Sequence, residues 1–116
     1  KDDTPGCTKE ACGFRDAQAD FSSIGATVIG VSKDSVAKHD KFKAKYELNF
    51  PLAADEDGTV CEAYGTWVEK SMYGHKYMGI DRATFLIDAD GKLAKIWRKV
   101  KVPGHVEAVQ AALKDL

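Results

Sequence analysis

Two cysteines near the start of the chain are the residues best suited to chemistry. Cys7 and Cys12 stand five residues apart, and Cys7 follows the turn-forming run Thr4-Pro5-Gly6. Apolar residues at helical spacing after this turn predict a helix that ends near residues 22–25. Cys7 then lies in the first turn, where unpaired backbone N–H groups and the positive end of the helix dipole favour a thiolate. The sequence therefore predicts a reactive thiolate at Cys7 rather than a small buried hydrophobe.

The segment TPGCTKEACGFRD, residues 4–16, resembles the active-site segment of the peroxiredoxins. A second cysteine five residues after the first is typical of their bacterioferritin-comigratory (Q-type) branch. Later segments agree with this branch: AYGTWVEK at 63–70, MYG at 72–74 and GIDRATFLID at 79–88. The resemblance runs essentially from end to end. It implies an α/β protein of thioredoxin-like fold, with a mixed central sheet flanked by helices and with the family's first strands missing from a chain that begins inside the active-site loop.

The resemblance implies a thiol-dependent peroxidase that reduces hydrogen peroxide and organic hydroperoxides. In such an enzyme the Cys7 thiolate attacks the O–O bond and becomes a sulfenic acid. Cys12 then condenses with the sulfenic acid to form an intramolecular disulfide, and thioredoxin or a similar thiol reductant returns it to the dithiol. The reaction needs no cofactor and no metal. On spacing alone, Cys12 is either this resolving thiol or a filler residue.

Three polar residues are expected to assist Cys7. The hydroxyl of Thr4 is placed to turn back toward the sulfur, although a cap or turn hydroxyl is the competing interpretation. Arg82 offers a charged fork of donors to the thiolate and the peroxide, and the resemblance favours this role over that of a solvated strand-end charge. Glu10, one turn after Cys7, is either a capping-box acid or, as the resemblance implies, part of the active-site hydrogen-bond network.

Intact helical geometry separates Cys7 from Cys12. Five residues along an α-helix place the two Cα atoms about 8.7 Å apart. A disulfide requires no more than about 7 Å, with converging Cβ vectors. We therefore expect the first turns of this helix to open after oxidation, which Gly6 and Gly13 make easier.

Length and composition narrow the remaining possibilities. The 116 residues predict a single domain, here a thioredoxin-like peroxiredoxin domain over 1–116 that is incomplete at its N-terminus. A net charge of −1 gives no indication of nucleic-acid or membrane binding. An odd count of three cysteines favours a reducing compartment, here the bacterial cytoplasm, and catalytic rather than structural use. We expect a monomer or weak dimer.

Other functional sites are less well supported by the sequence. No Cys-x-x-Cys occurs, which argues against a thioredoxin-type disulfide oxidoreductase. Cys61 is expected in the core. His39, His75 and His105 are scattered without cysteines at ligand spacing, which argues against zinc. The alternative function is a non-catalytic redox sensor or interaction module that uses the same Cys7 chemistry.

The rest of the chain is predicted to alternate strands and helices. In order we expect a buried strand at 27–32, a helix at 35–46 capped by Ser32 or Asp34, an extended segment at 50–54, a turn at 55–58, a short helix at 59–64, a loop at 69–79, a hairpin of strands 83–87 and 93–98, and a helix at 106–116. The apolar stripes of the two longer helices comprise Val36, His39, Phe42 and Tyr46, and Val106, Val109 and Leu116. This order predicts an α/β sandwich with a mixed sheet.

Overall fold

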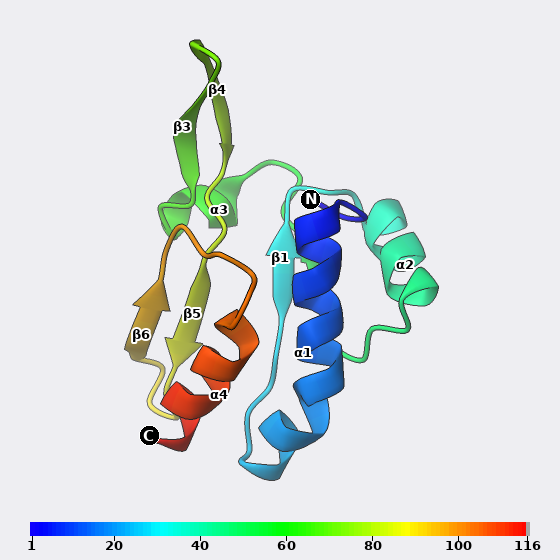
Figure 1. Ribbon diagram of the computed structural model, residues 1–116, viewed down its shortest axis with the longest axis vertical. Coiled ribbons are helices and arrows are strands. Elements are labelled where there is room, and N and C mark those ends of the chain that lie inside the picture. Colours follow the sequence, from blue (N-terminus) through cyan, green and yellow to red (C-terminus); the bar gives the residue numbers. More distant parts are fainter. Residues whose placement is uncertain (116) are drawn as a thin grey trace.

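The computed structural model describes residues 1–115 as four helices and six short strands (Figure 1). In chain order these are α1 (Pro5–Ser23), β1 (Gly30–Ser32), α2 (Val36–Lys45), β2 (Leu52–Ala54), α3 (Thr59–Ala63), β3 (Trp67–Met72), β4 (His75–Ile80), β5 (Thr84–Ile87), β6 (Leu93–Trp97) and α4 (His105–Lys114). All four predicted helices are confirmed to within a few residues. Leu116, predicted on the apolar face of the last helix, lies outside the described residues.

The cysteine helix α1 forms the centre of the packing. Pro5 starts it, where a missing N–H costs nothing because first-turn donors have no helical partner. Phe14, Ala17 and Phe21 are its buried residues, and the two phenylalanine rings stack with centroids 5.7 Å apart. Gly13 lets α4 approach closely, because a Cβ at this position would lie 2.9 Å from Cγ2 of Val106.

The hydrophobic core joins α1 to the helices on either side of it. Figure 1 shows α1 beside β1, with α2 on one side and α4 on the other. The buried apolar residues of this core are Phe14, Ala17, Phe21, Phe42, Leu48, Phe50, Val106 and Val109. The helix that carries both candidate active-site cysteines is therefore held from two sides, which fixes the position of its first turn.

The strands pair two by two instead of forming the one mixed sheet that was predicted. β1 and β2 are parallel, with Gly30 opposite Leu52, whereas β3–β4 and β5–β6 are antiparallel hairpins. The mixture of parallel and antiparallel pairing is as expected, but no described strand bridges β1 and β5. The predicted burial of the first strand is wrong: Ile29 and Val31 are 60% and 47% exposed, because no described element covers their side of β1.

The segment predicted as a loop at 69–79 is a hairpin. β3 and β4 pair from Trp67 opposite Ile80 to Met72 opposite His75, and Figure 1 shows the hairpin projecting from the rest of the molecule. Tyr73 and Gly74 form the turn with φ of 51° and 78°, the left-handed pair that suits a tight hairpin. Most of its side chains are exposed on both faces, so the sequence carries no alternating apolar pattern to reveal the strands.

Two details of α2 also differ from the prediction. The N-cap is Ser35, whose hydroxyl accepts a hydrogen bond from the backbone N of Lys38 at 3.2 Å, rather than Ser32 or Asp34. Val36 is 63% exposed because the first turn of α2 does not face the core. His39 and Phe42 are buried as the apolar stripe predicted.

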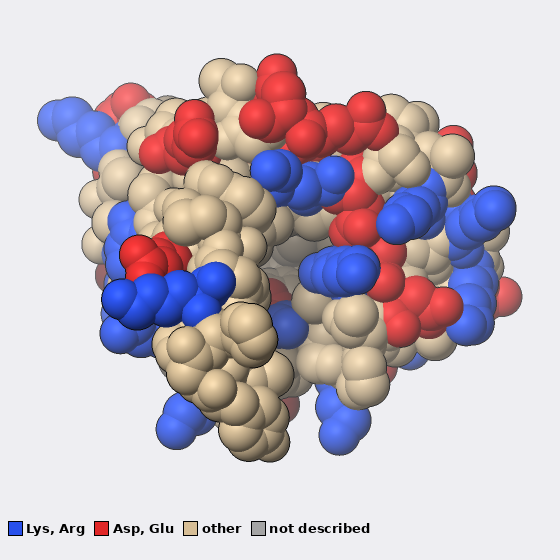
Figure 2. All heavy atoms as spheres, turned by 90° about the horizontal axis from the view of Figure 1, so that it is seen from above, with Lys and Arg blue, Asp and Glu red and all other residues tan. Residues whose placement is uncertain are grey.

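The surface carries both signs of charge. Viewed from above, the molecule shows acidic and basic side chains intermingled around a central hollow, without a field of one sign (Figure 2). Within residues 1–115 no helix is both long enough and apolar enough to span a membrane.

Candidate active site

Cys7 occupies the first turn of α1, as the sequence predicted. It is half-buried, and the backbone N of Thr8 donates to the carbonyl of Thr4 at 2.8 Å to close the turn around it. A cationic group donates to the sulfur: Nη2 of Arg82 lies 3.2 Å from Sγ. The sulfur therefore sits beside a cationic donor at a helix N-terminus, a setting that favours thiolate over thiol.

Arg82 contacts both Cys7 and Glu10, which precede it in the sequence by 75 and 72 residues, respectively. Its Nη2 reaches the sulfur, and its Nη1 donates to Oε2 of Glu10 at 2.6 Å. Both side chains are largely shielded, with exposures of 28% for Arg82 and 17% for Glu10. Glu10 therefore orients the guanidinium fork rather than capping the helix, and Arg82 is not a solvated strand-end charge.

Two features make this geometry possible: a backbone hydrogen bond at Arg82 and the absence of a side chain at Gly6 in α1. The carbonyl of Arg82 accepts from the N of Val100 at 2.9 Å, which ties the β4–β5 junction to the segment after β6. Gly6 provides room for the guanidinium, because a Cβ there would lie 2.9 Å from Nη2 of Arg82. The turn residue before Cys7 thus determines how closely the cation approaches the sulfur.

The environment lowers the pKa of Cys7. Burial alone raises the pKa of this thiol, whereas the positive charge of Arg82 beside the sulfur lowers it. Cys61 behaves in the opposite way: burial raises its pKa, and the neighbouring Asp55 carboxylate raises it further. The two thiols differ because Cys7 faces the Arg82 guanidinium and Cys61 lies beside the Asp55 carboxylate.

Thr4 is the N-cap residue of α1, but its hydroxyl makes no capping hydrogen bond to the helix and instead makes the local turn contact that was the competing interpretation. It has extended backbone angles, and its Oγ1 donates to the carbonyl of Lys1 at 2.6 Å. The sequence predicted a hydroxyl turned toward the sulfur. A hydroxyl carries one proton, so donation to the Lys1 carbonyl and donation to a thiolate or peroxide are alternatives for the same group.

The other two cysteines lie in different surroundings. Cys12 is half-buried on the unbroken helix α1, and all three cysteines are free. The continuous helix keeps Cys12 from bonding to Cys7 in this state, as its geometry predicted. Cys61 is 5% exposed in α3, which confirms its predicted place in the core.

Comparisons with known proteins identify the family. The family model described as AhpC/TSA family matches residues 1–96. The chain belongs to the AhpC/TSA family. It is 58% identical to a putative peroxiredoxin bcp of Coxiella burnetii over 113 residues, which are 97% of this chain and 75% of that protein. It is 52% identical to the peroxiredoxin Bcp of Bacillus subtilis over 116 residues, which are 100% and 74% of the two chains.

Solved structures agree on the branch and the fold. A structure of the bacterioferritin comigratory protein of Xanthomonas campestris, concerned with alkyl peroxide reduction, matches with a TM-score of 0.94 and 48% identity over 99% of this chain and 73% of that one. The protein is thus a peroxiredoxin of thioredoxin-like fold, an enzyme whose family acts on peroxides with a thiol reductant.

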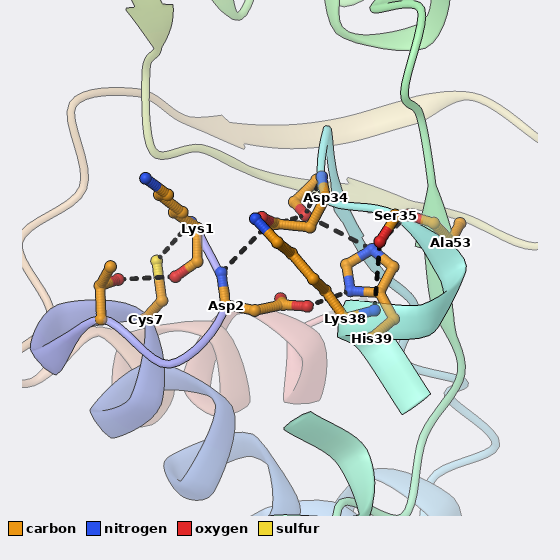
Figure 3. A network of polar contacts seen from close by, with 10 residues as sticks. Lys1, Asp2, Cys7, Asp34, Ser35, Lys38, His39 and Ala53 are labelled. Carbon is orange, nitrogen blue, oxygen red and sulfur yellow. Dashed lines mark hydrogen bonds and ion pairs between the residues drawn. The ribbon is translucent and has the colours of Figure 1, made fainter. Parts of the chain in front are cut away.

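Sequence reasoning missed a second group of residues in this peroxiredoxin. The loop before Cys7 is tied to α2 by Asp2, which lies against the buried His39, and by Asp3, which accepts hydrogen bonds from Tyr46 and Lys45 (Figure 3 shows the Asp2 part). The contacts join residues 37 to 43 positions apart, so no local spacing could reveal them. The sequence offered one signal for these contacts: His39 lies on the apolar stripe of a helix, and two acids, Asp2 and Asp3, precede Cys7.

Proposed function

We propose that this peroxiredoxin reduces hydrogen peroxide and organic hydroperoxides by direct attack of the Cys7 thiolate on the O–O bond. The sulfur forms a bond to one oxygen, the O–O bond breaks, and the departing oxygen takes up a proton as water or an alcohol. Cys7 becomes a sulfenic acid. The observation that carries the proposal is the Arg82 fork, which reaches the Cys7 sulfur at 3.2 Å while Glu10 holds its other arm at 2.6 Å.

The fork supports catalysis through charge. Negative charge moves from the sulfur to the leaving oxygen during attack, and a guanidinium already in place stabilises both ends without reorganising. Donors positioned in this way typically contribute a few kcal/mol, about 3, to a transition state. Thr4 is the second proposed donor. Rotation of its hydroxyl replaces the hydrogen bond to the Lys1 carbonyl with a hydrogen bond to a peroxide oxygen.

Cys12 is proposed to complete the cycle. Its thiol attacks the oxidised Cys7 sulfur, a disulfide forms and water leaves. Because α1 holds the two residues apart, its first turns must open before the bond forms. The dithiol is then regenerated by thioredoxin or a similar thiol protein, which becomes oxidised in turn. The alkyl peroxide reduction of the Xanthomonas relative supports the inclusion of organic hydroperoxides.

Turnover of peroxide with a thioredoxin system tests the proposal. Cys7→Ser is expected to abolish peroxide consumption, whereas the matched control Cys61→Ala is expected to keep it. Substantial turnover by Cys7→Ser would remove Cys7 from the attacking role. Stoichiometric oxidation of the wild-type chain without turnover would favour the redox-sensor function instead. A single domain over 1–116, a monomeric or weakly dimeric state and a bacterial cytoplasmic location stay predictions.

A further inference from the structure

A buried histidine on α2 holds the loop that precedes Cys7. His39 is 4% exposed, and its Nδ1 lies 2.6 Å from Oδ2 of Asp2, whose side chain is 10% exposed (Figure 3). The other ring nitrogen, Nε2, lies 3.2 Å from the carbonyl oxygen of Ala53 in β2. The imidazole therefore links the active-site loop to both α2 and β2.

The hydrogen bonds around His39 determine where its protons lie. A carbonyl oxygen only accepts, so Nε2 must donate to Ala53. Ser32 lies 3.4 Å from Nε2, but its hydroxyl proton goes to Oδ2 of Asp34 at 2.8 Å, so Ser32 does not supply the proton instead. With Nε2 protonated, the 2.6 Å contact between Nδ1 and the Asp2 carboxyl requires a further proton between them. Without it, a lone pair would face a carboxylate.

The charges around the pair are those of the loop and of the start of α2. Asp34 accepts from the backbone N of Asp2 at 2.8 Å, and Lys38 of α2 lies near Asp34 (Figure 3). Burial, with Asp34 adding to it, raises the pKa of the Asp2 carboxyl against the opposing effect of His39. An acid of raised pKa keeps a proton in the pair more readily.

The loop needs this restraint because its conformation is unfavourable. Asp3 has φ of 60°, in the left-handed region that non-glycine residues rarely adopt. On one side the carboxylate of Asp3 is held by Tyr46 at 2.7 Å and by Lys45 at 2.9 Å. On the other side the loop passes directly to Thr4, the proposed donor to the peroxide.

We propose that His39 is a positioning residue of the peroxidase, which shares a proton with Asp2 and thereby holds loop 1–4 in place against α2. The effect on catalysis rests on the proposed function, whereas the restraint itself does not. His39 touches neither sulfur nor substrate, so it acts only through the loop.

Stopped-flow measurement of peroxide reduction across pH tests the catalytic part. In the wild type the second-order rate constant is expected to rise as Cys7 ionises. Asp2→Asn keeps a hydrogen bond to the imidazole, so its rate is expected to stay closer to that of the wild type than the rate of Asp2→Ala, which keeps none. His39→Gln is expected to lower the rate on the order of tenfold at all pH values, because a misplaced donor costs reactivity. The control His75→Asn, at an exposed position, is expected to match the wild type.

Amide hydrogen exchange on the reduced protein tests the restraint without peroxide. Amides of residues 2–4 are expected to lose protection in His39→Gln, while those around Phe14 stay protected. Unchanged loop protection together with an unchanged rate profile in His39→Gln would overturn the proposal. If His39→Gln does not fold, an Asp2→Ala variant with the rate and the loop protection of the wild type overturns the proposal equally. Loop release without any peroxide reduction by the wild type would leave the restraint standing and refute the proposed function.

Discussion

Replacing Arg82 with lysine is expected to slow peroxide reduction although it keeps the positive charge. The guanidinium serves Glu10 at 2.6 Å and the Cys7 sulfur at 3.2 Å through two different nitrogens. A single ammonium on a flexible stem does not reproduce this planar fork, so it keeps one contact at the expense of the other. Loss of one hydrogen bond to a charged group costs about 1.5–3 kcal/mol. Each 1.36 kcal/mol is tenfold in rate, so the rate constant should fall about 10- to 150-fold.

Two assays read this change independently. Stopped-flow oxidation gives the second-order rate constant with peroxide, and the pH dependence of iodoacetamide alkylation gives the pKa of Cys7. Because a lysine ammonium that pairs with Glu10 lies farther from the sulfur than Nη2 of Arg82 does, Arg82→Lys should raise the pKa of Cys7, and thiolate formation should shift to higher pH. Arg98→Lys is the matched control, since Arg98 donates to the carbonyls of Tyr64 and Gly65 rather than to Cys7 or Glu10. An Arg82→Lys variant equal to the wild type in both assays would refute the role given to the fork.

Three further predictions follow from the packing around α1. Gly6→Ala should lower the rate of peroxide reduction, because the added Cβ would lie 2.9 Å from Nη2 of Arg82. It should not lower stability in urea unfolding, because alanine favours the helix. An unchanged rate would show that the guanidinium moves aside freely. Phe21→Ala should cost about 3–5 kcal/mol of unfolding free energy, since Phe21 is 2% exposed; a loss below about 1 kcal/mol would contradict its place at the core centre. In the oxidised protein, amides from Thr8 to Cys12 should lose protection, and a Cys7–Cys12 disulfide with that helix fully protected would exclude the opening step.

The parts of the fold with a strong periodic signal were predictable from the sequence. The stripe of Phe14, Ala17 and Phe21 marks α1, and the apolar runs around a Gly-containing turn mark the β5–β6 hairpin. The β3–β4 hairpin was not predictable, because side chains exposed on both faces leave no alternation and Tyr73 is an unusual residue for a left-handed turn position. Burial of β1 was overestimated because β-branched residues indicate a strand but not what covers it.

The candidate site was likewise predictable from the sequence only in part. The position of Cys7 at a helix start follows from local sequence, since a Pro-Gly turn precedes an apolar period. The meeting of Arg82 with Cys7 and Glu10 spans more than 70 residues and came only from the family resemblance. The contact between Asp2 and His39 came from neither source, because a histidine on an apolar stripe indicates burial without indicating its partner.

Trapping the first oxidised intermediate tests the central claim most directly. In a Cys12→Ser variant treated with one equivalent of peroxide, the sulfenic acid has no resolving thiol, so it should persist long enough to react with dimedone. Peptide mass mapping should then find the adduct on Cys7 and leave Cys61 unmodified, in keeping with the lowered pKa of the first thiol and the raised pKa of the second. Peroxide consumption with the adduct on Cys61, or with no adduct on Cys7, would contradict the account.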